Sequence, residues 1–151
     1  MFTTEDLTSV PQMQDMDCEC GYLSDIVVDD DIVLKKLNKL RHDKAPGPDN
    51  IQPRFLKEIG DLICHPLAVI FRRSLEEGIV PDDWRFANVS PIYKKGSRSQ
   101  VSNYCPVSLT SQVCKVFEAI IHDDIMEHLL INKLVRSSQH GFLWGRSCLS
   151  N

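Results

Sequence analysis

Apolar residues recur at steps of three and four in two stretches of the sequence, the pattern of helices with one buried face. The first stretch follows three consecutive aspartates, 29–31, which suit the start of a helix. Its predicted buried positions are Val33, Leu34, Leu37 and Leu40. The second stretch covers about residues 112–131, with Thr110 or Ser111 as its cap. Its predicted core stripe is Val113, Val116, Phe117, Ile120, Ile121, Ile125 and Leu129.

Two further helices are predicted between these stretches. Pro53 suits the first turn of a short helix over residues 54–59, which Gly60 is expected to end. Residues 61–77 predict a mostly buried helix in which Pro66 either introduces a kink or marks the true start, and Gly78 ends it. The apolar residues expected to be buried in this helix are Leu62, Ile63, Leu67, Val69, Ile70, Phe71 and Leu75.

A β-hairpin is predicted between the last two long helices. Residues 86–93 and 104–109 are rich in strand formers, and the segment between them, 94–103, forms a polar and basic tip. Trp84, just before the first strand, is interpreted as a core anchor rather than a functional residue. Helices interrupted by one hairpin predict an α+β fold in which helix dominates.

Charge is divided unevenly along the chain, although the formal net charge is only −4. The first 31 residues contain nine acids and no Lys or Arg, so residues 1–28 are interpreted as an acidic flexible leader and 29–151 as the folded domain. Between Trp84 and Phe117 there are five basic residues and no acid. This stretch either attracts phosphates or is a plain solvated loop. Its basic residues are Arg85, Lys94, Lys95, Arg98 and Lys115.

The six cysteines have no paired framework, which favours free thiols in a reducing compartment. Cys18 and Cys20 are too close for the usual zinc spacing and have no second pair, so a zinc site is not expected. No apolar run reaches the roughly 20 residues of a membrane span, and the N-terminus has no signal-peptide pattern. We therefore expect an intracellular protein without membrane contact.

Six groups of residues along the chain resemble motifs of one family. They are KAPGPD at 44–49, FRRSL at 71–75 with GIVPDDW at 78–84, VSPIYKKG at 89–96, NYCPVSLTS at 103–111, CKVFE at 114–118, and QHGF at 139–142 with GRS at 145–147. This order and spacing resemble the reverse transcriptase domain of non-LTR (LINE-type) retrotransposons, over about residues 32–151.

The resemblance implies a right-hand polymerase, of which this chain would supply the fingers and the approach to the palm. In that family the basic hairpin lies over the template and the incoming nucleotide, so Lys94, Lys95 and Arg98 are expected to contact phosphates. Lys44 is expected to contact template RNA from its proline-stiffened loop, unless that loop only ends the preceding helix. The implied partners are an RNA template and a DNA primer, both held by the parent polymerase.

Two departures from the family pattern limit the function expected of these residues. Cys105 stands where the family typically has an Arg that meets nucleotide phosphates, and a thiol cannot replace a guanidinium. The catalytic carboxylates of two-metal nucleotidyl transfer are also missing, because no tyrosine is followed by x-Asp-Asp. Asp123 and Asp124 are assigned to the solvated face of a helix rather than to a metal site. No catalytic residue and no metal ligand is therefore assigned.

The sequence thus predicts a truncated, by itself inactive fragment of an RNA-directed DNA polymerase. No cofactor is expected for the fragment, whereas Mg²⁺ is implied for the full-length family. The alternative is a non-catalytic nucleic-acid-binding remnant, or a decayed open reading frame without activity. Because a fingers fragment normally packs against a palm, we expect uncovered apolar surface and a tendency to self-associate.

Overall fold

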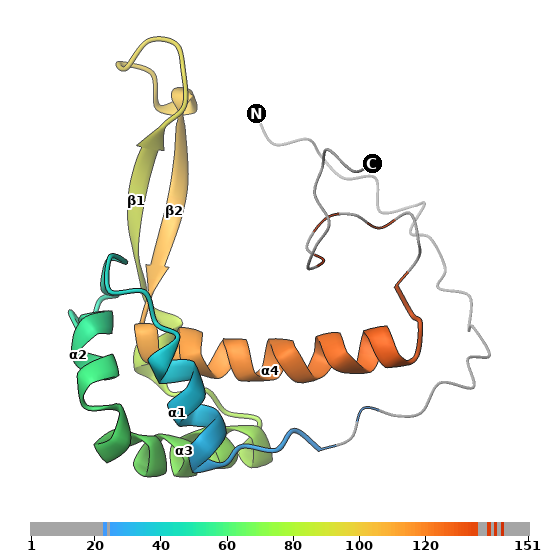
Figure 1. Cartoon of the computed structure of the whole chain (residues 1–151). Coiled ribbons are helices and arrows are strands. Elements are labelled where there is room, and N and C mark those ends of the chain that lie inside the picture. Colours follow the sequence, from blue (N-terminus) through green and yellow to red (C-terminus); the bar gives the residue numbers. More distant parts are fainter. Residues whose placement is uncertain (1–22, 24, 136–138, 140, 142, 144–151) are drawn as a thin grey trace.

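A layer of helices forms the base of the molecule, and one β-hairpin projects from it (Figure 1). The computed structural model describes residues 23, 25–135, 139, 141 and 143. Within this part the fold mixes helices with a single two-stranded antiparallel sheet, as the α+β prediction requires. Most of the acidic leader, the cysteines at 18, 20 and 148, and the GRS motif at 145–147 lie outside the described residues.

The first helix, α1, spans Asp30–Asn38 and begins as predicted. The carboxylate of Asp29 accepts a hydrogen bond from Ile32 N at 2.7 Å and so caps the first turn. Val33 and Leu37 are fully buried, which confirms the predicted inner face of this helix. The hydrophobic core also includes Val28, just before the cap.

Helices α2 and α3 follow one another directly. α2 spans Pro53–Glu58 with Pro53 in its first turn, and α3 spans Gly60–Glu77. The prediction that Gly60 only ends the short helix is wrong, because Gly60 begins α3. A Cβ added to Gly60 would lie 3.3 Å from Leu34 Cδ1, so glycine lets α3 approach α1 closely. Pro66 lies inside α3 and does not mark its start.

Helix α3 is less buried than its sequence predicts. Its inner face is formed by Cys64, Ala68, Phe71 and Ser74, all with little or no exposed surface. Leu62 is 79% exposed, and Val69 and Ile70 are also exposed, so their assignment to the buried set is wrong. The helix has more apolar positions than one face can hold, and packing buries only the positions that face α1 and α4. Gly78, at φ 65°, ends the helix in the left-handed conformation.

Three aromatic rings lie together in the core. Phe71 of α3 stacks on Phe117 of α4 with ring centroids 4.8 Å apart. Trp84 meets both rings, with its centroid 5.7 Å from Phe71 and 5.9 Å from Phe117. Trp84 lies in the short 3-10 helix η2, Asp82–Arg85, which leads into the hairpin. The interpretation of Trp84 as a core anchor is confirmed.

The hairpin pairs β1, Ala87–Tyr93, with β2, Tyr104–Thr110, in the antiparallel register that joins Tyr93 to Tyr104 and Ala87 to Thr110. The predicted hairpin and its tip are confirmed, and a short 3-10 helix, η3, occupies Val101–Asn103 within the tip. All seven residues of β1 are exposed. Among the described residues, no helix therefore packs over the outer part of this hairpin (Figure 1).

The last helix, α4, spans Gln112–Ile131 and is capped by Ser111, whose hydroxyl accepts from Val113 N at 3.2 Å. Its N-terminal half carries the buried side chains, whereas Ile125 is 40% exposed and Ile131 69% exposed. The core stripe thus ends earlier than predicted, because α4 extends beyond α1 and α3 (Figure 1). Within the described part of the chain, no helix has the length and apolar content needed to cross a bilayer.

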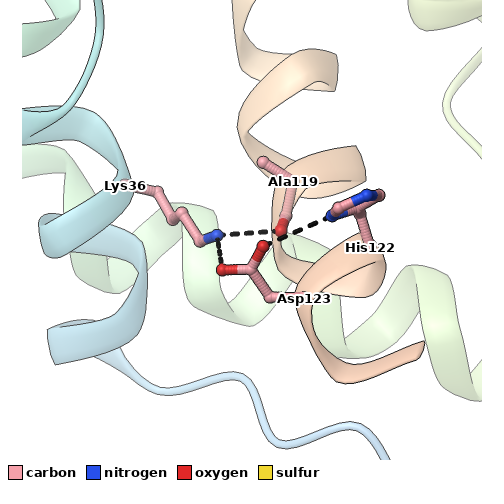
Figure 2. Close-up of polar contacts among 4 residues, drawn as sticks. All are labelled: Lys36, Ala119, His122 and Asp123. Carbon is pink, nitrogen blue, oxygen red and sulfur yellow. Dashed lines mark hydrogen bonds and ion pairs between the residues drawn. The ribbon is translucent and has the colours of Figure 1, made fainter. Parts of the chain in front are cut away.

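A charged contact joins α1 to α4 beside the core. The Lys36 ammonium pairs with the Asp123 carboxylate and donates to Ala119 O at 2.8 Å (Figure 2). The ring of His122 lies on the other side of the same carboxylate, with Nδ1 3.4 Å from Oδ1. The hydrogen bond from Lys36, together with His122, lowers the pKa of Asp123. Asp123 therefore contributes to helix packing as a carboxylate.

Candidate nucleic-acid interface

Lys44 lies in the exposed loop after α1. It follows two charged residues, Arg41 and Asp43, that form an ion pair with each other. Arg41 donates to both carboxylate oxygens of Asp43, at 3.0 and 2.6 Å. This pairing lowers the pKa of Asp43 and raises that of Arg41. Lys44 itself forms no ion pair with another described residue. Its ammonium is therefore the cation of this loop that remains available to an external anion.

The loop that carries Lys44 is anchored at the base of the hairpin. Gln112, the first residue of α4, donates from Nε2 to Ala45 O at 2.6 Å. A Cβ on Gly47 would lie 2.6 Å from Ser111 N, so only glycine fits against the junction of β2 and α4. The loop next turns through Asn50 at φ 56°. The KAPGPD segment is thus a loop with a defined conformation that is anchored to the hairpin base. It does more than end the preceding helix.

The tip of the hairpin, residues 94–103, is closed by hydrogen bonds within the loop. The two tyrosines at the ends of the strands donate to the loop backbone: Tyr93 Oη to Gly96 O at 2.5 Å and Tyr104 Oη to Arg98 O at 2.9 Å. Asn103 Nδ2 donates to Ser97 O at 2.8 Å. Lys94 N donates to Asn103 O at 2.8 Å and extends the strand pairing by one step. The tip therefore has a defined shape.

The structure divides the five cations of the basic stretch into two groups. Arg85 pairs with Asp82 at 3.5 Å near the base of the hairpin, and Lys115 is half-buried on α4. Lys94, Lys95 and Arg98 are exposed on the tip and form no ion pair with other described residues. Three of the four predicted site residues thus share one loop.

The fourth predicted site residue, Lys44, lies at the opposite end of the hairpin from the other three. Its loop contacts the β2–α4 junction, whereas the tip begins beyond Tyr93 and Tyr104. Six residue steps along β2 separate these positions, or about 20 Å at 3.3 Å per step. The four cations therefore do not form one cluster, and they mark the two ends of an elongated surface.

The pleat of the hairpin also separates Cys105 from the tip arginine. Residues paired across the strands share a face, so Cys105 lies with Ile92 and the adjacent pair, Tyr93 and Tyr104, lies on the opposite face. Arg98 places its guanidinium 5.1 Å from the centroid of the Tyr93 ring. It is therefore on the tyrosine face and cannot replace the arginine that the family pattern has at position 105.

Carboxylates that could hold Mg²⁺ do not come together in the described residues. These residues contain no group of three or more His, Cys, Asp or Glu side chains able to hold a metal ion. Asp123 is engaged with Lys36, as described above, and its neighbour Asp124 lies on the half-buried side of α4. The Mg²⁺ that the family resemblance implies does not fit the side chains of this part of the chain.

The described cysteines are Cys64, Cys105 and Cys114, and all three are free thiols. Burial, with Glu118 close by, raises the pKa of Cys114 to about 11, so this thiol stays protonated near neutral pH. Cys64 is buried in the core, and Cys105 is half-buried on β2. For these three residues, the expectation of free thiols is confirmed.

Two features of the interface were not identified from the sequence. The sequence places Tyr93 and Tyr104 in strands and in family motifs but does not indicate that their side chains meet, although residues that flank a hairpin loop face one another. The bond from Gln112 to Ala45 has no sequence signal, because its two residues lie 67 positions apart. Only the folded chain brings the Lys44 loop and the hairpin base together.

Comparison with known proteins finds relatives of one kind. The chain is 31% identical over 111 residues to the RNA-directed DNA polymerase from mobile element jockey of Drosophila melanogaster, a match that covers 73% of the chain and 12% of that protein. It is 27% identical over 116 residues to the probable RNA-directed DNA polymerase from transposon BS of the same species, covering 76% and 13%. The Pol polyprotein from type-1 retrotransposable element R1 of Bradysia coprophila is 25% identical over 119 residues, covering 78% and 12%. No family model matches the chain.

These matches confirm the resemblance that the sequence motifs indicate. Over about three quarters of its length, the chain is related to the RNA-directed DNA polymerases of non-LTR retrotransposons. It spans only 12–13% of the length of the relatives named above. The relationship therefore concerns one segment of a much longer kind of protein.

Proposed function

We propose that this chain forms part of the fingers of an RNA-directed DNA polymerase and binds the phosphates of template RNA paired with a DNA primer. The observation that carries the proposal is the exposed basic tip: Lys94, Lys95 and Arg98 project on a hairpin without any acid between Trp84 and Phe117. Exposed cations that form no ion pair within the described part of the chain attract phosphates, and lysine requires little directional geometry to do so. The relationship to retrotransposon polymerases supports the same assignment.

The length of the hairpin suits a nucleic acid that lies along it. Lys44 and the tip cations are separated by about 20 Å. Phosphates along one strand of a DNA duplex are about 3.4 Å apart along the axis and are closer in an A-like hybrid, so the two ends of this surface match contacts at least about six nucleotides apart. In this arrangement the KAPGPD loop and the tip bind phosphates of one template strand at two points and fix its direction along the hairpin.

The proposed role is binding without catalysis by these 151 residues alone. Nucleotidyl transfer needs clustered carboxylates that hold two metal ions. The consecutive acids of α4 do not supply them, because Asp123 is committed to Lys36. In the parent polymerase, Mg²⁺ would be held by residues outside this segment. We therefore expect RNA binding but no primer extension by the isolated chain.

Binding of an RNA–DNA hybrid at about 50 and about 200 mM salt tests this proposal. The Lys94→Ala/Lys95→Ala variant should bind about tenfold more weakly at the lower salt, since each exposed contact contributes up to about 1 kcal/mol. Its plot of log affinity against log salt should also become shallower by roughly 1.4 to 1.8, the loss of two phosphate contacts. The matched control is Lys35→Ala/Lys39→Ala, which removes two exposed lysines from α1 and its C-cap and should change binding less than twofold.

Equal losses in the two double variants would mean that binding follows net charge alone, and the tip would have no special role. No measurable binding of the unchanged chain would reject the proposal and favour a decayed reading frame. Salt-dependent binding without primer extension, in the presence of Mg²⁺ and nucleotides, is the expected result.

Self-association is the second part of the proposal. Several apolar side chains of α3 and α4 are exposed, and a larger polymerase would offer a surface to cover them. The most exposed are Leu62, Val69, Ile70, Ile125, Leu130 and Ile131. We expect the isolated chain to sediment as mixed oligomers at micromolar concentration. A Leu130→Gln/Ile131→Gln variant should shift it toward a monomer, and a wild-type chain that is monomeric throughout would contradict this.

A further inference from the structure

At the tip of the hairpin, three planar groups lie together in a small cluster. The rings of Tyr93 and Tyr104 meet edge to face, with centroids 5.6 Å apart and an interplanar angle of 64°. The guanidinium of Arg98 lies over the ring of Tyr93, 5.1 Å from its centroid. The guanidinium therefore has an aromatic ring on one side, and the Arg98 residue is exposed.

Hydrogen bonds fix the backbone around this cluster. Tyr104 Oη holds the backbone of Arg98 through its carbonyl, and Tyr93 Oη holds Gly96 O in the preceding turn. Gly96 takes φ 89°, and a Cβ there would lie 2.7 Å from Asn103 Nδ2, so the turn accepts only glycine. The backbone that carries Arg98 is thus fixed next to Tyr93, where its guanidinium lies against the ring. Holding it in advance lowers the conformational entropy that a ligand would otherwise have to remove.

Electrostatic attraction to phosphate does not require this arrangement. Lys94 and Lys95 supply point charges, and they do so without any aromatic support. A guanidinium differs because it is planar and weakly hydrated, and it stacks on flat π-systems. Arginine planes and aromatic rings are the surfaces on which proteins stack unpaired bases.

We propose that the outer face of Arg98, backed by Tyr93, binds an unpaired nucleobase of single-stranded RNA by stacking. This inference rests on the proposed function and refines it, since it gives the tip a preference for unpaired strand ahead of a duplex. A paired base is already stacked on its neighbours and cannot enter this position. The tip then combines two kinds of contact: Lys94 and Lys95 bind phosphates, and Arg98 with Tyr93 binds one base.

The test uses the full 151-residue chain and a short RNA that carries one 2-aminopurine, a base whose fluorescence is quenched by stacking. The same strand is measured alone and in a duplex. The unchanged chain should alter the fluorescence of the single strand on binding and should prefer it to the duplex by about tenfold. Arg98→Lys keeps the positive charge and removes the plane. It should abolish the fluorescence change and the preference, with the salt dependence unchanged.

Two further variants separate the possible causes. Tyr93→Leu removes the backing ring and should give the same losses as Arg98→Lys. Lys94→Gln should weaken binding and make the salt dependence shallower, with the fluorescence change retained at saturation. Because β1 and the tip are exposed, none of these variants should move the midpoint of urea unfolding appreciably.

The outcomes distinguish this inference from the proposed function. An Arg98→Lys chain that still quenches and still prefers the single strand would overturn the stacking site, while phosphate binding by the lysines would stand. If the unchanged chain binds neither RNA, both proposals fail. Loss of the preference in both Arg98→Lys and Tyr93→Leu, but not in Lys94→Gln, is the result that supports stacking.

Discussion

The helical base and the hairpin are built on different physical principles. In the base, Phe71, Phe117 and Trp84 pack ring against ring, and Phe71 is fully buried. In the hairpin, every residue of β1 is exposed, and order comes from cross-strand pairing and from the hydrogen bonds of the tip. The base therefore supplies the folding free energy, through apolar burial, and the hairpin contributes little to it.

This difference separates stability from binding. The cations proposed to bind nucleic acid are on the hairpin or at its base, away from the aromatic cluster. A change at the tip should thus alter binding with little effect on unfolding, and a change in the cluster should do the reverse. The loop around Gly47 is where the two regions meet, because it packs on the β2–α4 junction.

The largest effect is expected from Phe71→Ala. Removing this fully buried ring leaves a cavity beside Phe117 and Trp84, and should lower the free energy of unfolding by about 3–5 kcal/mol. Urea unfolding followed by circular dichroism measures the loss. The matched control on the same helix is Leu62→Ala, at a position 79% exposed, which should cost less than about 0.5 kcal/mol. Similar losses at the two positions would mean that the aromatic cluster is not the centre of the core.

The next effect concerns binding rather than stability. Cys105→Arg restores the charge that the family pattern has at this position, on the face that Cys105 shares with Ile92. A charge-assisted contact of this kind contributes about 1.5–3 kcal/mol, so nucleoside triphosphate affinity should rise by one to two decades. Isothermal titration measures it. Ser108→Arg, which adds the same charge on the other face, is the control. An equal gain from both variants would exclude a face-specific site.

The smallest effect is expected at the contact between α1 and α4. The pKa of Asp123 is lowered in the folded chain, so its contribution to stability is present above the ordinary value of 3.8 and is lost as the pH falls through the lower, folded-state pKa. Because Asp123 is largely exposed, Asp123→Asn should cost only about 0.2–1 kcal/mol at neutral pH. The difference between the variant and the unchanged chain should vanish in strong acid, as measured by urea midpoints at several pH values. A constant difference would assign the effect to packing instead.

The sequence predicted the local structure well where one physical rule dominates. Asp29 and Ser111 cap their helices as expected, since each is a good cap directly before an apolar pattern. Gly78 ends α3 for the reason its position suggests, and the two strand-forming stretches pair as a hairpin. The prediction failed at Gly60 and at the outer residues of α3. At both positions, whether the helix begins or the side chain is buried depends on the neighbouring helix that packs there. The spacing of apolar residues in the sequence does not reveal that neighbour.

The cationic residues of the candidate interface could be predicted from the sequence, but their positions relative to one another could not. Lys94, Lys95 and Arg98 could be identified because they lie in a stretch of basic residues without acids, and Lys44 because it opens the KAPGPD segment. Their separation into a tip group and Lys44, about 20 Å apart, follows only from the length of the hairpin and from the anchoring of the KAPGPD loop. The position of Arg98 on the tyrosine face, opposite Cys105, likewise depends on the strand register.

By itself, the sequence determined the helices and their caps, the hairpin, the distribution of charge and the relationship to retrotransposon polymerases. These properties depend on residues close together in the chain, or on the identity and order of short motifs. Only the tertiary structure decided which apolar faces are covered, how Gln112 and Gly47 fix the Lys44 loop, and that Arg98 lies against Tyr93. These features depend on contacts between residues that are far apart in the chain. The energy of such contacts is set by how closely the helices and strands pack, and the spacing of residues in the sequence does not show it.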